Sequence, residues 1–278
     1  MFKRLILVST AVATMAWATA SQAGPVFLTG HDPDFHAQDS TGASNLLRES
    51  LNFVTGGSYS GGVKRFLFVE SDIPTPSGHR IGENGLNALG LAEGVNYDEV
   101  DAAGLAALAN FKGYSAIVVA SDFGGLLGDA EIRGLTARKA DIAAFVNAGG
   151  GLAAYAECGV GFSNCNPDLV NATTPLFGFV PIGVSSVNTT SPYTVTPYGA
   201  SLGLTDADVN DPTHNSFLPV SGLNVVDHDA AGIPTTYAGN VTIGGGGFGV
   251  PEPATWAFMV LGFGAMGAAL RSRRRLIA

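Results

Sequence analysis

Residues 114–156 decide the fold, and they read YSAIVVASDFGGLLGDAEIRGLTARKADIAAFVNAGGGLAAYA. Two apolar runs in this stretch, Tyr114–Ala120 and Gly151–Ala156, predict buried strands. Between them Thr136–Asn147 has the spacing of a helix, and Gly149 follows as a stop. The apolar residues of that helix share one face: Ile142, Phe145 and Val146. Apolar strands that alternate with helices imply an α/β fold whose parallel sheet is covered on both faces.

The same alternation extends back to the start of the body. The predicted strands upstream are Pro25–Gly30, Lys64–Glu70 and Tyr97–Val100. The predicted helices are Ser44–Val54, Gly82–Leu91 and a short Ala/Leu helix that ends at Phe111. We therefore expect one α/β body over residues 24–243, large enough to bury a core.

The last third of the body has a different composition. Residues Phe177 to Ile243 are rich in Val, Thr, Pro and Gly, which favours short strands and loops. Short strands are expected at Phe179–Val184, Tyr193–Thr196, Asn224–Val226 and Asn240–Ile243. A Gly-rich linker, residues 244–250, then leads to the end of the chain.

The body resembles flavodoxin-like and class I glutamine amidotransferase-like domains, the superfamily that includes trehalose-utilisation-type proteins. The resemblance is carried by the helix that runs into Gly149-Gly150-Gly151 and a strand, and by Leu223–Asp227 as a closing strand. It covers about residues 25 to 160. It implies a parallel sheet with helices on both faces and a Cys nucleophile on a tight turn after a strand.

The amino-terminal residues 1–23 have the layout of a secretory signal peptide. Lys3 and Arg4 precede an apolar run, Leu5–Ala20, and small residues lead to a cleavage position after Ala23. We expect signal peptidase to remove this segment. The alternative is a retained membrane helix.

The carboxyl-terminal residues 251–278 contain a second apolar segment. Ala254–Leu270 is long enough for a helix of roughly 25 Å, which can span a membrane before processing. An arginine cluster follows and is expected to stay cytoplasmic: Arg271, Arg273, Arg274 and Arg275. The body then lies outside the inner membrane, in agreement with the signal peptide.

This tail resembles the PEP-CTERM sorting signal in its variant with Trp-Ala after two free residues. The matching residues are Pro251, Glu252, Pro253, Trp256 and Ala257, followed by the apolar segment and the arginines. The resemblance implies an exosortase as partner, loss of the tail, and a Gram-negative bacterium that makes exopolysaccharide, a further possible partner. The alternative is a single-pass anchor that is never cut.

The body is strongly acidic. Between Gly24 and Val250 lie 8 basic and 22 acidic residues, so the net charge of this part is near −14. Such a surface repels phosphate backbones, which excludes nucleic acid as an expected partner.

Polar residues follow several predicted strands, and ligands bind at the carboxyl ends of strands in open parallel sheets. The candidate ligand- or metal-binding residues are His31, Asp32, Asp34, His36 and Asp122. A divalent cation is the one cofactor that such groups suggest. The alternative is an ordinary turn, because Asp and Pro are common turn residues.

Cys158 follows the strand Gly151–Ala156, as the amidotransferase-like resemblance implies for a nucleophile. Glu157 stands where that family has a small residue, and His214 is the candidate base. The competing interpretation is a disulfide between Cys158 and Cys165, which is typical of exported proteins. We expect the disulfide.

The sequence therefore predicts an exported protein with a binding or structural role at the cell surface or in the extracellular matrix. It contains no complete catalytic set that we recognise. The alternative is an extracellular hydrolase or amidotransferase-like enzyme that uses strand-end acids and histidines, or Cys158.

Overall fold

The structure is a computed structural model, and it describes residues 23–59, 64–71, 83–121, 127–156, 177–210 and 215–243. The chain divides into two compact units, residues 1–20 with 245–278, and residues 21–244. All the described residues belong to the second unit, which is the body.

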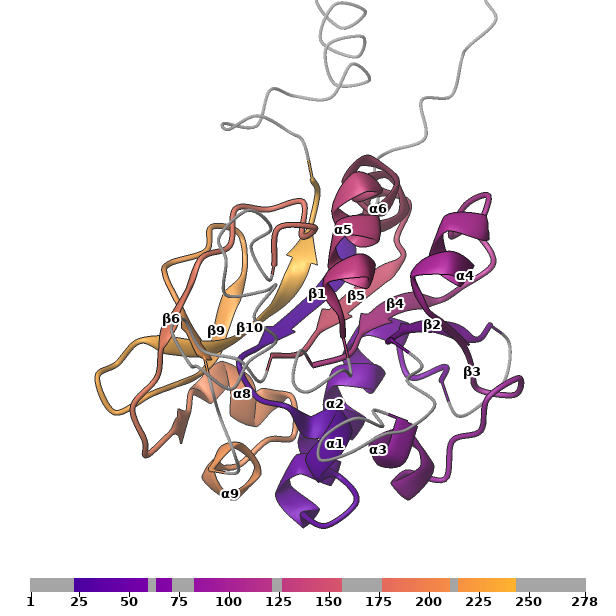
Figure 1. The fold of residues 1–278 in the computed structure, drawn as a ribbon. Helices are drawn as coiled ribbons and strands as arrows, with labels where there is room; N and C mark the ends of the chain where they lie inside the picture. Colours follow the sequence, from indigo (N-terminus) through magenta and orange to yellow (C-terminus); the bar gives the residue numbers. More distant parts are fainter. Residues whose placement is uncertain are drawn as a thin grey trace, which may run out of the picture. The chain divides into compact units, whose positions relative to one another are not determined.

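An eight-stranded mixed sheet forms the centre of the body (Figure 1). Its strands lie in the order β3-β2-β4-β5-β1-β10-β9-β7. The first five are parallel: β3 Tyr97–Val100, β2 Phe66–Val69, β4 Ala116–Val119, β5 Gly151–Ala154 and β1 Gly24–Thr29. The others pair antiparallel: β10 Pro234–Val241, β9 Asn224–His228 and β7 Thr194–Val195.

The parallel strands form here because each places apolar side chains on both faces of the sheet. In β4, Ile117 and Val119 enter the core on one face, while Ala116 and Val118 enter the core on the other. All four are buried. A strand buried on both faces reads as a continuous apolar run, which explains why the sequence pattern marks it clearly.

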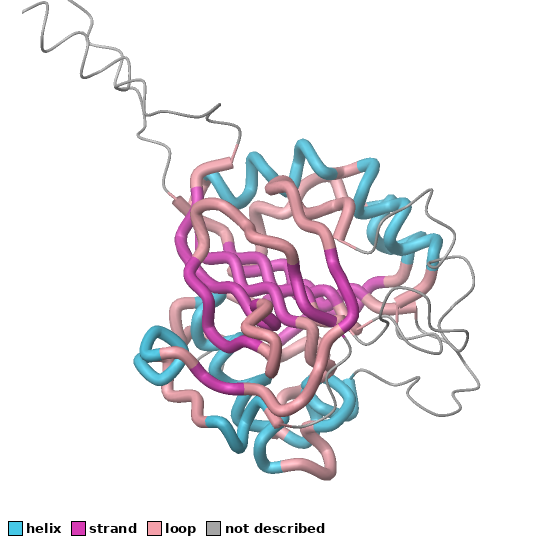
Figure 2. Tube along the Cα trace, turned by 90° about the vertical axis from the view of Figure 1, so that its left-hand side faces the viewer, coloured by secondary structure: helices cyan, strands magenta, loops and turns pink. Residues whose placement is uncertain are grey.

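Helices cover both faces of the sheet, so that it lies between two helical layers (Figure 2). One layer contains α4 Ala102–Ala107, α5 Asp129–Ala137 and α6 Lys139–Asn147. The opposite layer contains α1 Pro33–His36, α2 Thr41–Thr55, α3 Glu83–Ala88, α8 Pro197–Ser201 and α9 Asp206–Val209. The longest of these, α2, begins where Ser40 Oγ accepts from the Ala43 N–H and ends at Gly56, whose φ is 63°.

A small second sheet pairs β6 Ser186–Asn188 with β8 Asn215–Phe217, antiparallel. Phe217 of β8 belongs to the main core, where its ring meets those of Phe177 and Tyr237. The late segment of the chain is therefore part of the same folded body.

The prediction of a parallel sheet with helices on both faces is confirmed for the first five strands, and Tyr97–Val100 has the bounds that we predicted. The last third differs. The strand expected at Phe179–Val184 is absent from the described residues there, and the one expected at Asn240–Ile243 begins at Pro234. We expected the late strands to form a separate segment after the parallel sheet. Instead they extend that sheet, because β10 pairs with every residue of β1.

The strand order also departs from the flavodoxin-like one. Strands β2 to β5 occupy its first four places, 2-1-3-4, but the fifth place is taken by β1, the first strand of the chain. The first strand of the body, β1, is thus the last strand of the parallel part. It also pairs with β10, the first strand of the antiparallel part.

None of the described helices is long and apolar enough to cross a bilayer. The segments predicted as signal peptide, linker, membrane helix and arginine cluster lie outside the described residues, apart from Ala23.

Candidate functional site

Buried polar side chains gather at the carboxyl edge of the parallel strands. His31 and Asp32 follow β1, Glu70 follows β2 and Ser121 follows β4, and each is at most 2% exposed. The antiparallel strands β9 and β10 add Asp227 and Thr235. The parallel strands bring together groups that are up to 90 residues apart in sequence, as the topology predicts.

His31 forms a buried pair with Asp227. Its Nε2 lies 3.0 Å from Asp227 Oδ2, and Thr235 donates a hydrogen bond to the same oxygen. The Tyr193 ring meets the imidazole edge-on at 5.6 Å between centroids. The ring of His31 is therefore fixed in orientation by an acid, as the base is in many hydrolases.

Asp34 lies in α1 and is held against the end of β4. Its Oδ2 accepts hydrogen bonds from the Ser121 N–H at 2.8 Å and the Ser121 hydroxyl at 3.1 Å. Burial raises the pKa of Asp34 to about 7, and the nearby charge of Asp32 acts in the same direction against the Ser121 hydrogen bonds. Asp34 Oδ1 has no hydrogen-bond partner among the described residues. Asp34 is thus a carboxyl group that can be neutral near pH 7.

Asp32 pairs with His36 one helical turn away, at 3.2 Å between Asp32 Oδ2 and His36 Nε2. Burial raises the pKa of Asp32 to about 6, although the hydrogen bond and the charge of His36 act in the opposite direction. His36 also lies 3.6 Å from the exposed carboxylate of Asp39.

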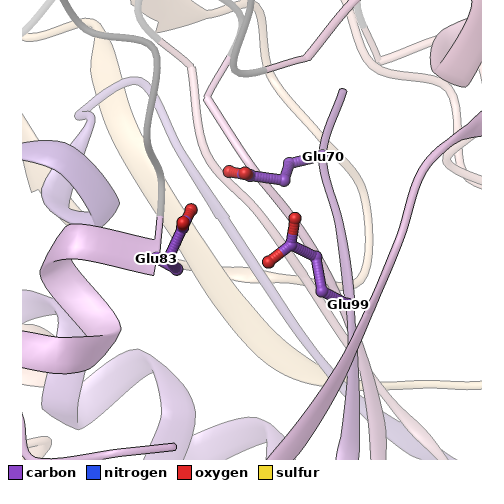
Figure 3. Close-up of side chains that lie close together, drawn as sticks. All are labelled: Glu70, Glu83 and Glu99. Atoms are coloured by element: carbon purple, nitrogen blue, oxygen red, sulfur yellow. The ribbon is translucent and has the colours of Figure 1, made fainter. Parts of the chain in front are cut away.

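A second group at the same edge consists of Glu70, Glu83 and Glu99, and Figure 3 shows their carboxylates directed toward one another. Glu70 follows β2, Glu99 lies in β3 and Glu83 opens α3. One oxygen from each lies within 4.8 Å of the other two. Oxygen-only sets of this kind suit Mg²⁺ or Ca²⁺, but acidic groups also meet in proteins that bind no ion.

In the structure, the described residues among those that we predicted as ligands do not converge on one point, and they have different partners. His31 pairs with Asp227, Asp32 with His36, and Asp34 with Ser121. Among the described residues, the metal-ligating side chains that converge are the three glutamates and not the His31–His36 segment. Metal binding at that segment therefore stays a hypothesis.

Sequence reasoning did not identify Glu83 or Glu99. The available signal was the strand Tyr97–Val100, whose third residue is acidic and which runs beside the strand that precedes Glu70. Asp227 ends the predicted closing strand Leu223–Asp227, but no local signal placed it or Thr235 beside His31, because that contact depends on antiparallel pairing between β10 and the distant strand β1.

The remaining candidates lie outside the described residues: Asp122, Glu157, Cys158, Cys165 and His214. The nucleophile and the disulfide therefore stay predictions.

The fold and the candidate site define the class of protein. It is an α/β protein with an open mixed sheet, and buried acidic residues and a histidine lie at the carboxyl edge of the parallel strands. Comparison with known protein families adds the particular feature of this chain. The family model of the PEP-CTERM protein-sorting motif matches residues 249–275. The predicted sorting signal is confirmed, so the chain is an exosortase-targeted exported protein, delivered to the cell envelope or beyond.

Searches with the chain found no matching curated protein and no matching solved structure. The motif covers only the end of the chain, so the amidotransferase-like resemblance of the body receives no support.

Proposed function

We propose that the body serves as a binding or structural domain at the cell surface or in the extracellular matrix, after an exosortase has removed its tail. The observation that carries this proposal is the sorting motif at residues 249–275. The acidic body supports it, because a charge near −14 between Gly24 and Val250 keeps a protein soluble outside the cell. Signal peptidase and exosortase are the partners proposed for processing.

The processing step is tested in an exosortase-carrying Gram-negative host and in the same host without the enzyme. We expect mass spectrometry of the exported protein to show loss of the tail only in the first host. Glu252→Ala is expected to keep the tail attached, and Thr255→Ala, at one of the two free positions of the motif, to be processed normally. A full-length carboxyl terminus in the exosortase-carrying host contradicts the proposal.

An extracellular hydrolase is the second candidate, and the His31–Asp227 pair favours it. An imidazole oriented by a buried acid is half of a nucleophilic catalytic set. Screening the exported protein with esters, amides and glycosides separates the two functions. Turnover that His31→Ala abolishes, in a variant with an unchanged circular dichroism spectrum, establishes the enzyme and overturns the binding role.

A further inference from the structure

A pocket of about 800 Å³ opens at the edge of the sheet opposite to the glutamates. The starts of three parallel strands border it, with Pro25 at β1, Ser115 before β4 and Gly150 before β5. The carboxyl-terminal ends of α2 and α6 complete its wall. A volume of this size is that of small-molecule sites in proteins.

Aromatic rings form much of the pocket's lining: Phe53, Phe111, Tyr114 and Phe145. Phe111 and Phe145 are buried and meet with their centroids 6.0 Å apart, so they form a fixed base. Phe53 and Tyr114 are only partly buried and can offer ring surface to a ligand. The side-chain amides of Asn110 and Asn240 add donors and acceptors at the rim.

The charge at this pocket is opposite to that of the body. Lys64 and Lys112 both line it, and neither ammonium group has an ion pair or hydrogen bond with the described residues. Asp141, the one acidic residue among the described residues of the lining, is already paired with Arg138 at 3.1 Å. Two lysines without an ion pair to the described residues thus line one pocket of a body whose net charge is near −14.

Other basic side chains that the structure describes are engaged elsewhere. Arg65 pairs with Asp98, Arg133 with Asp129, and Lys139 donates to the Gly178 carbonyl. The free charge at Lys64 and Lys112 is therefore a local property of the pocket, and it complements an anion.

We propose that this pocket binds an acidic saccharide whose uronate carboxylates meet Lys64 and Lys112 and whose ring faces lie on Phe53 and Tyr114. The inference rests on the proposed function, a binding role at the cell surface or in the extracellular matrix. The side-chain amides of Asn110 and Asn240 can bond hydroxyl groups, which a saccharide supplies in number.

An acidic peptide fits this pocket less well. Extended peptides bind by adding a strand to a free sheet edge, where backbone groups pair along its length. The pocket is bordered instead by strand starts and helix ends, and β1, β4 and β5 are each paired on both sides. The pocket therefore offers no backbone ladder to a peptide.

The test is calorimetric titration of the exported protein, purified as the cell delivers it, with trigalacturonate, neutral maltotriose and triglutamate. We expect trigalacturonate to bind and the other two to bind at least about fivefold more weakly, with affinity falling as salt is raised. Lys64→Gln and Lys112→Gln should each weaken trigalacturonate binding about fivefold. Lys139→Gln, a lysine outside the pocket, is the matched control and should leave it unchanged.

The proposal is overturned if trigalacturonate does not bind, if maltotriose or triglutamate binds as tightly, or if the pocket variants bind like the control. Circular dichroism confirms that each variant is folded. Because binding is measured on purified protein, failure here with normal tail processing rejects only the saccharide. Binding without tail processing rejects the exosortase step and leaves the pocket's ligand in place.

Discussion

At the scale of single residues, the fold keeps two carboxyl groups away from water. Asp34 is fully buried and Asp32 nearly so, and burial is the largest cause of their raised pKa values, about 7 and about 6. In the unfolded chain both groups return to the ordinary value of 3.8. Their stabilising contribution is therefore complete below about pH 4 and is lost as the pH rises through their folded pKa values.

Asp34→Asn should make stability less dependent on pH. The amide has no proton to lose, so the wild-type decline attributable to Asp34 disappears. The free energy of unfolding of the wild type should fall between about pH 4.5 and pH 8, and in Asp34→Asn this fall should be smaller by about 3 kcal/mol. Urea titrations at the two pH values measure it. Asp39→Asn, an exposed carboxyl beside His36, is the control and should reproduce the wild-type decline.

The His31–Asp227 pair should behave as a coupled unit. His31→Ala leaves Asp227 buried with the Thr235 hydroxyl as its remaining side-chain partner among the described residues, and should cost about 3 kcal/mol of unfolding free energy. In the double variant His31→Ala/Asp227→Ala the buried charge is gone too. Its cost should fall short of the sum of the single costs by at least about 1 kcal/mol in urea unfolding. Strict additivity contradicts the coupling.

At the scale of elements, the contact between α2 and β5 depends on a glycine. A Cβ at Gly151 would lie 2.0 Å from the Val54 carbonyl oxygen, a backbone atom that cannot turn away. Gly151→Ala should therefore separate the end of α2 from the start of β5 and cost about 2–4 kcal/mol in urea unfolding. Gly183→Ala, where no atom lies within 4 Å of the added Cβ, is the matched control and should change stability by less than about 0.5 kcal/mol.

At the scale of the whole molecule, the body is closed by its last strand. Strand β10 lies between β1 and β9, and Gly24 pairs with Val241, so both ends of the described body leave the sheet at one edge. Asn147 holds that end in place: its side-chain amide donates to the Ile243 carbonyl and accepts from the Ile243 N–H, both at 2.6 Å. The fold is thus complete before the linker and the sorting tail begin.

Truncation tests this. A chain that ends at Ile243 should unfold cooperatively, with a free energy within about 0.5 kcal/mol of the exported protein. A chain that ends at Gly232 lacks β10, exposes the edges of β1 and β9, and should show no cooperative transition in urea. Cooperative unfolding of the shorter chain would show that β10 is dispensable to the core.

The sequence by itself determined the features that are local. The sorting motif, the strand Tyr97–Val100 and the helical face of Ile142, Phe145 and Val146 each follow from spacing within a short stretch, and apolar periodicity records which face is buried. The gathering of polar groups at the strand ends was also predictable, since parallel strands end at one edge.

Only the tertiary structure decided which of those groups meet. Asp227 reaches His31 across 196 residues, and β10 pairs with β1 from the far end of the body. Glu83 and Glu99 converge with Glu70 from different elements. The periodicity of apolar residues shows which face of an element is buried, but it does not show which element packs against that face. Pairing between distant strands depends on the packing of the whole sheet, which no short stretch of sequence determines.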